Sequence, residues 1–111
     1  MKYIKTYENL NNEPEIGNYV LMYYDINGGG NKKLRTYLNN NIGVIVDYEH
    51  DDEVVTIRYE NYPIELVKIL YDDTAYNNGV VIRSLSSKFI RDFSKNKEEL
   101  ELIIAQNKYN L

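Results

Sequence analysis

The densest group of positive charges in the chain is Lys32, Lys33 and Arg35, and tyrosines lie on both sides of it. Cations that contact phosphates, interleaved with aromatic faces that stack on bases, are typical of RNA and single-strand binding sites. The same pattern also fits a solvated helical turn whose tyrosines enter the core. The residues that we predict to contact a partner are Tyr23, Tyr24, Lys32, Lys33, Arg35 and Tyr37.

Two other segments carry chemically interesting residues. Gly28-Gly29-Gly30, followed by Lys32, suggests a phosphate loop, but the Gly-Lys-Ser/Thr ending is missing, which favours a surface loop or one that a partner orders. His50-Asp51-Asp52-Glu53 gathers acid–base and ligand groups at an exposed corner, where metal ligands lack supporting hydrogen bonds. No nucleophile stands at a meaningful spacing from a base. We therefore predict no enzymatic activity, no metal site and no cofactor.

Length and composition narrow the class of protein. The chain has 111 residues, enough for one domain around one core. Its formal net charge of −4 favours solubility over coating of nucleic acid, although a local basic patch remains compatible with it. Cysteine is absent, which excludes disulfides and cysteine-ligated zinc. No apolar run approaches the roughly 18 residues of a membrane span, so no membrane interaction is expected.

The strongest fold signal is a hairpin of two β-branched and aromatic runs, residues 42–49 and 54–60, around the corner at residues 50–53. A four-residue loop sets Glu49 opposite Val54. The inner pairs are then all apolar, and a slip of one residue would turn Asp47 and Glu49 toward this face. The pairs predicted to face the core are Tyr48 with Val55, Val46 with Ile57, and Val44 with Tyr59. Val46→Asp should then cost over about 3 kcal/mol.

The remaining segments complete a mostly β (α+β) domain. We predict further strands at 16–25, 80–83 and 89–93, with Phe89, Arg91 and Phe93 on one face. One helical turn is expected at 32–38. It should end at Asn39-Asn40-Asn41, because asparagine tolerates a left-handed backbone. A short helix is expected near 63–71. The loop 72–79 ends in an Asn-Gly turn. The predicted organisation is an arm and linker at 1–15, a small β-barrel at 16–93, and a C-terminal helical segment at 94–111.

The most secure predicted helix runs from about 96 to 107. Asn96 and Glu99 have the spacing of a capping box, and the acidic first turn suits the helix dipole. Its apolar stripe is expected to seal one end of the barrel, with Leu102 outside the stripe. The stripe consists of Leu100, Ile103, Ile104 and Asn107.

Three segments together resemble the Src-homology-three-like small barrels of ribosomal and transcription-elongation KOW modules: residues 16–20, 41–46 and 54–59. The resemblance implies a five-stranded barrel, to which the 63–71 and C-terminal helices are additions. The ending Phe93 to Leu100 is similar to that of small proteins of tailed phages. Met1-Lys2 followed by Lys5-Thr6-Tyr7-Glu8 also resembles the short capsid-targeting leads of such phages, so Met1–Leu10 is either a lead or a docked arm.

From this resemblance we expect a non-enzymatic, phage-type accessory protein that binds another protein. It would act in the virion or as an inhibitor of a host defence factor, and so be located in the virion or the host cytoplasm. One alternative is an RNA or single-stranded nucleic-acid binding module of the KOW kind. Another is a sponge for a small signalling nucleotide, with residues 25–41 as its lid. A monomer and a small homo-oligomer both fit the sequence.

Overall fold

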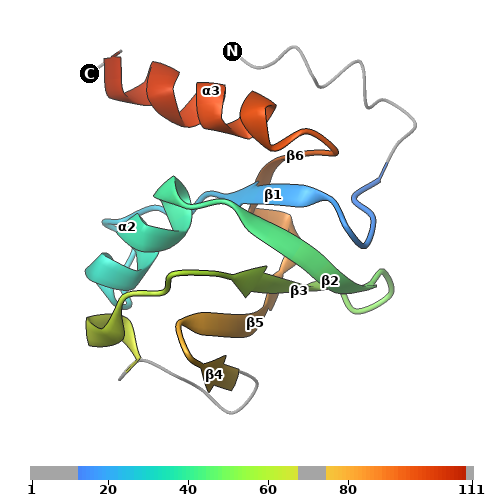
Figure 1. Ribbon diagram of the computed structural model, residues 1–111, viewed down its shortest axis with the longest axis horizontal. Coiled ribbons are helices and arrows are strands. Elements are labelled where there is room, and N and C mark those ends of the chain that lie inside the picture. Colours follow the sequence, from blue (N-terminus) through green and yellow to red (C-terminus); the bar gives the residue numbers. More distant parts are fainter. Residues whose placement is uncertain (1–12, 68–74, 110–111) are drawn as a thin grey trace.

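The computed structural model describes residues 13–67 and 75–109 (Figure 1). The predicted N-terminal lead and the part of the predicted 63–71 helix beyond residue 67 lie outside the described residues. The elements, in chain order, are β1 (Tyr19–Met22), α2 (Lys32–Asn40), β2 (Gly43–Glu49), β3 (Val54–Tyr59), the 3-10 turn η1 (Ile64–Leu66), β4 (Ala75–Asn77), β5 (Val80–Ser86), the 3-10 turn η2 (Ser87–Phe89), β6 (Ile90–Ser94) and α3 (Lys97–Tyr109).

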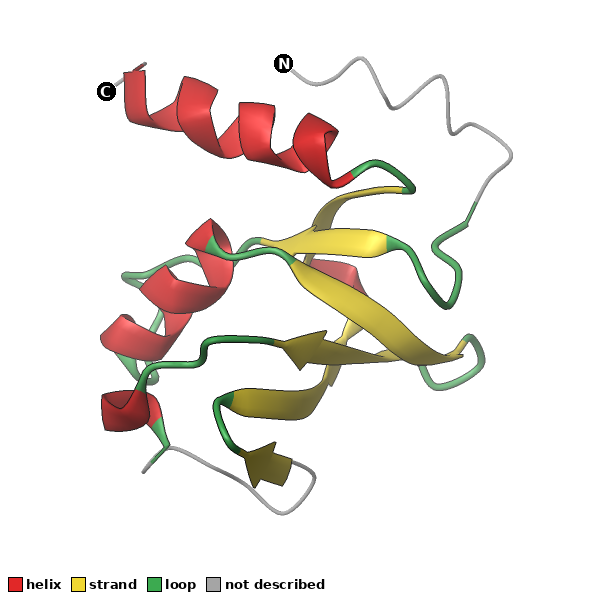
Figure 2. Ribbon diagram, viewed as in Figure 1, coloured by secondary structure: helices red, strands yellow, loops and turns green. Residues whose placement is uncertain are grey.

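The strands form one six-stranded antiparallel sheet in the order β4-β5-β3-β2-β1-β6. α3 packs on β1 and β6, and α2 lies at one side of the sheet against β1 (Figure 2). The domain is thus a compact α+β unit in which strands dominate.

The predicted closed, five-stranded barrel is wrong in its closure and in its number of strands. Among the described residues, the strands at the two ends of the sheet, β4 and β6, do not pair. β4 is an added strand that pairs with β5 at Val80–Ile82 and so occupies that part of the outer edge of β5. The turn between β4 and β5 is the predicted Asn-Gly turn, with Asn78 and Gly79 at φ of 51° and 87°, as a two-residue hairpin loop requires.

The predicted hairpin is confirmed near its corner and corrected further along. Glu49 faces Val54 and Tyr48 faces Val55, as expected for the loop at 50–53. The register then shifts between Ile45 and Asp47, so that Ile45, rather than Val46, lies opposite Ile57. Val44 lies opposite Arg58 instead of Tyr59. A β-bulge adds one residue to one strand and thereby changes which side chains face inward.

The bulge explains how an acidic residue fits into a strand that lines the core. Ile45 and Ile57 are fully buried, whereas Val46 is only partly buried and Asp47 is exposed. Without the extra residue, strict alternation would carry Asp47 to the same face as Ile45. The predicted core residues Val46 and Val44 are therefore replaced by Ile45 in β2.

The two helices are anchored by buried leucines and by capping side chains. Leu34 and Leu38 of α2 join the core, and Leu100 of α3 is fully buried. Asn31 caps α2 by accepting a hydrogen bond from the backbone N–H of Leu34 at 2.9 Å. Asn96 caps α3 by accepting from Glu98 at 2.9 Å. The predicted C-terminal helix is confirmed, and Leu102 lies outside its buried stripe with 63% of its surface exposed.

Three local predictions differ from the structure. The predicted single turn at 32–38 is a helix of nine residues, and Asn41 ends it in an extended conformation (φ −131°) rather than a left-handed one. Asn40 and Asn41 instead donate from Nδ2 to the carbonyls of Thr36 and Tyr37, each at 2.8 Å, and so fold their side chains back on the last turn of the helix. Phe89 lies in η2 and not in the last strand, because the Ser86 side chain caps that turn.

Candidate functional site

The predicted site residues do not form one surface, because α2 separates them. With 3.6 residues per turn, Leu34 and Leu38 turn one face of α2 into the core. Lys32, Lys33 and Tyr37 lie on the flank toward η1, where they line one groove. Arg35 lies on the other flank, toward the segment that follows β1. The sequence grouped these residues, but the helix places them in two environments.

On the Arg35 flank, the polar and aromatic groups are engaged with one another. The ring of Tyr24 stacks on Phe89, with centroids 4.6 Å apart, and the Arg35 guanidinium lies 5.7 Å from the Tyr24 centroid. Nη1 of Arg35 donates to the carbonyl of Asp25 at 2.7 Å. Asn39 exchanges two hydrogen bonds with the backbone of Tyr24, at 2.6 and 2.7 Å. These contacts hold the 24–31 loop against α2 and give Tyr24 and Arg35 a structural role.

Tyr23 is the most solvent-accessible of the predicted aromatic residues. Its backbone N–H donates to the carbonyl of Phe89 at 2.8 Å, and 55% of its surface is exposed. Phe89 is also 44% exposed. Both residues therefore expose aromatic surface near the end of β1 and η2, and neither lines the groove beside Lys32 and Lys33.

Tyr37 belongs to a buried cluster of phenols beneath α2. Its ring meets those of Tyr59 and Tyr62 edge-on, at centroid distances of 5.8 and 5.1 Å. Tyr59 is fully buried and Tyr62 is 4% exposed. Arg83 of β5, 5% exposed, places its charge close to both. The sequence analysis did not single out Tyr62 or Arg83; the signal for Arg83 was an arginine directly after the apolar run Val80–Ile82.

Burial governs the ionisation of this cluster. It raises the pKa of Tyr37 to about 12, with the neighbouring Tyr62 phenol adding to the effect. Burial also raises the pKa of Tyr59, Tyr62 and Tyr24, and the positive charge of Arg83 partly offsets this rise in each. Phenols with raised pKa values stay neutral at physiological pH. The cluster is therefore a neutral aromatic floor rather than an acid–base site.

Tyr59→Phe is expected to raise the free energy of unfolding by about 1 kcal/mol near neutral pH, because the buried Tyr59 hydroxyl has no hydrogen-bond partner among the described residues. Above pH 10 the unfolded chain releases phenol protons that the folded chain retains, so wild-type stability falls as the pH rises. The advantage of the variant should therefore grow between about pH 8 and pH 11. Urea unfolding at both pH values measures it.

Tyr23→Phe is the control for this experiment, because the Tyr23 ring is 55% exposed. It should leave the stability unchanged at both pH values. If Tyr59→Phe lowered the free energy of unfolding by as much as a lost hydrogen bond does, the Tyr59 hydroxyl would have a hydrogen-bond partner. The description of that hydroxyl as unpartnered would then be wrong.

The Lys32 and Lys33 flank of α2 borders an open groove with a volume of about 620 Å³. Its floor is apolar, formed by Tyr37, Pro63 and Leu66, and Glu65 stands on the side opposite the lysines. Both lysines are exposed and make no ion pair within the described residues. Next to the groove, Ile64 exposes 70% of its surface. The groove between α2 and η1 thus combines an apolar floor with a positively charged rim, and the exposed side chain of Ile64 lies next to it.

The acidic corner of the hairpin is exposed, as predicted. His50 stacks on Tyr48 at 4.1 Å, and its Nδ1 lies 2.8 Å from a carboxylate oxygen of Glu13. Across residues 13–67 and 75–109 no group of three or more His, Asp or Glu side chains could hold a metal ion. The corner thus has a local partner, supplied by the residues that lead into β1.

Comparison of the chain with known protein families, with curated proteins and with solved structures finds no match. Neither of the helices in the described residues is long and apolar enough to cross a membrane.

Proposed function

We propose that this protein is a non-catalytic module that binds another protein through the groove between α2 and η1. The observation that carries the proposal is an apolar floor, Tyr37, Pro63 and Leu66, beside two ammonium groups, Lys32 and Lys33, that make no ion pair with residues 13–67 or 75–109. Exposed apolar surface with a polar rim is typical of interaction sites. Two cations against the single carboxylate of Glu65 leave the rim with an excess of positive charge.

The charge and shape of the groove define the partner segment that would fit it. An aliphatic or aromatic side chain would fill the apolar floor beside Ile64. Flanking carboxylates would then approach Lys32 and Lys33, and this complementarity would favour encounter and register. The proposed occupant is therefore an acidic segment of a partner protein with one apolar anchor.

The proposed biological role rests on the resemblance of the sequence to Src-homology-three-like barrels and to small proteins of tailed phages. The strand order β5-β3-β2-β1-β6 and the 3-10 turn directly before β6 support a relation to Src-homology-three-like sheets, with β4 added at the edge. Together with the resemblance to small phage proteins, this supports a virion component or an inhibitor of a host factor. Such folds serve many functions, so the groove and not the fold specifies the partner.

Nucleic-acid binding through the same residues is less favoured. The rings of Tyr24 and Tyr37 are held in contacts with Phe89, Tyr59 and Tyr62, and base stacking needs an accessible ring face. Arg35 lies on the flank of α2 away from Lys33, where its guanidinium contacts the Asp25 carbonyl and the Tyr24 ring and not the groove. If single-stranded RNA bound in a salt-dependent way and Lys33→Glu abolished that binding, nucleic-acid binding would become the favoured function in place of protein binding.

The proposal is tested by photo-crosslinking in the cell that produces the protein. A benzoylphenylalanine in place of Ile64 should cross-link to one defined protein, whereas the same group in place of the exposed Leu102 of α3 should not. Lys33→Glu should reduce the cross-link at least about ten-fold by reversing the rim charge. The cross-linked peptide of the partner is expected to be acidic.

Lys95→Glu makes the same charge change at an exposed position before α3, away from the groove. It should leave the cross-link unchanged. Equal loss with both lysine variants, or equal capture from positions 64 and 102, would mean that the groove is not the binding site.

A further inference from the structure

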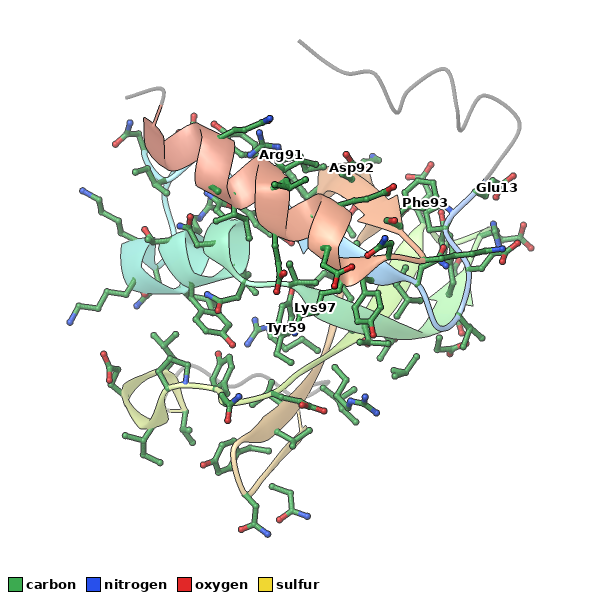
Figure 3. All side chains as sticks on the ribbon, turned by 45° about the horizontal axis from the view of Figure 1, so that its top comes forward. Glu13, Tyr59, Arg91, Asp92, Phe93 and Lys97 are labelled. Carbon is green, nitrogen blue, oxygen red and sulfur yellow. The ribbon has the colours of Figure 1, made fainter. Side chains whose placement is uncertain are left out.

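A second cleft, of about 480 Å³, lies between α3 and the sheet and shares no lining residue with the α2–η1 groove. It is bordered by α3, by the starts of β1 and β2, by the C-terminal end of α2 and by the end of β3. In Figure 3, Lys97 lies where α3 begins, on the side of the helix toward the strands. The volume of the cleft falls within the range of small-molecule sites, roughly 300–1,000 Å³.

The cleft contains polar groups that the protein itself does not use. Nε of Arg58 is buried without a hydrogen-bond partner among the described residues, and its Nη2 lies 3.6 Å from the Glu60 carboxylate, a long contact. Lys97 and Glu101 make no ion pair with any part of the chain that the structure describes. Buried polar atoms without partners are rare in native proteins, so this nitrogen is a donor that a bound group can use.

The asparagines at the end of α2 add hydrogen-bond acceptors. Asn40 and Asn41 use their Nδ2 groups on the carbonyls of Thr36 and Tyr37, so their amide oxygens remain for other donors. Asn61, at the end of β3, has a left-handed backbone (φ 57°) and no side-chain hydrogen bond within residues 13–67 and 75–109. Three side-chain amides thus border the same cleft as the two cations.

We infer that this cleft binds a nucleoside monophosphate. Arg58 and Lys97 would contact the phosphate, for which arginine and lysine are the usual partners. The carboxylates of Glu60 and Glu101 can accept hydrogen bonds from ribose hydroxyls, as acidic residues do in dinucleotide sites. The amides of Asn40, Asn41 and Asn61 can read a base edge, while the apolar walls at Tyr19 and Ile104 contact its faces.

Each part of the cleft thus has a matching part of the ligand. A ligand with charge alone would leave the apolar walls and amides unused. A purely apolar ligand would desolvate Lys97 and Glu101, which have no ion-pair partner among the described residues, and this is unfavourable. This inference is independent of the proposed protein-binding groove, because either surface can be occupied without the other.

The test is titration of the full chain with AMP, GMP, CMP and UMP, followed by calorimetry and by amide shift mapping. At least one nucleotide should bind saturably, with shifts at α3 and at the ends of α2 and β3. Lys97→Gln should weaken its affinity about ten-fold or more, as expected for loss of one charge-assisted contact. Lys95→Gln removes the same charge two residues earlier, outside the cleft, and should change nothing.

Inorganic phosphate and the unphosphorylated nucleosides separate the contributions of the ligand. Both should bind more weakly than the nucleotide. The inference is overturned if no nucleotide binds at millimolar concentration, if a nucleoside binds as tightly as its monophosphate, or if Lys95→Gln and Lys97→Gln weaken binding equally. Both lysines are exposed, so the variants should keep the wild-type melting temperature, which is measured on the same samples.

Discussion

Ile45→Asp is expected to lower the free energy of unfolding by more than about 3 kcal/mol, because it places a carboxylate in the core without a partner. Val46→Asp, one residue along the same strand, should cost only about 1 kcal/mol. Ile45 is fully buried opposite Ile57, whereas Val46 is the extra residue of the bulge and is partly exposed. Equilibrium urea unfolding followed by circular dichroism measures both.

Val46→Asp is the control for Ile45→Asp, because both variants add one negative charge to β2. Against a total stability of about 5–15 kcal/mol for a domain of this kind, the Ile45 variant should be largely unfolded or close to it. The opposite order, with Val46→Asp the more severe change, would restore the strict alternation expected from the sequence and remove the bulge from β2.

Gly43→Ala is expected to cost about 1–3 kcal/mol by overpacking the sheet. A Cβ at this position would overlap Cγ2 of Ile57 and would lie 3.0 Å from Cε1 of Tyr59 and 3.1 Å from the carbonyl oxygen of Arg58. Two of these neighbours are fully buried, so neither can move aside without disturbing the core. Thermal unfolding followed at matched pH measures the cost.

Ile57→Ala supplies the matched background for this prediction, because it removes the Cγ2 methyl group that the new Cβ would meet. In a double-mutant cycle, Gly43→Ala should cost less in the Ile57→Ala protein than in the wild type. Additive costs would show that the steric conflict with Ile57 does not determine the requirement for glycine at position 43.

Much of the secondary structure was encoded locally and could be predicted from the sequence. The corner at residues 50–53, the Asn78-Gly79 turn and the C-terminal helix each depend on side chains within a few residues of one another. Turn types and helix caps are set by short-range sterics and hydrogen bonds. The pairs Glu49–Val54 and Tyr48–Val55 follow directly from the length of that corner.

Contacts between distant segments decided what the sequence pattern left open or predicted incorrectly. The bulge at Val46 turns Asp47 outward while keeping Ile45 opposite Ile57, a compromise between two strands that alternation in one strand cannot reveal. The hairpin of β4 and β5 adds a sixth strand, which pairs with Val80–Ile82 at the edge of the sheet. Both outcomes depend on which edges and faces are already occupied by other parts of the chain.

The candidate sites show the same division. The sequence by itself determined that cations and tyrosines gather near residues 23–37, because that clustering is a property of neighbours along the chain. Only the tertiary structure decided that Arg35 contacts Asp25 and Tyr24 on the flank of α2 away from Lys33, and that Pro63 and Leu66 complete the groove beside Tyr37. It also brought Arg58, in the middle of the sequence, and Lys97, near its end, to one cleft. A helix distributes adjacent residues around its axis, and a sheet joins residues far apart, so proximity in sequence does not determine proximity in space.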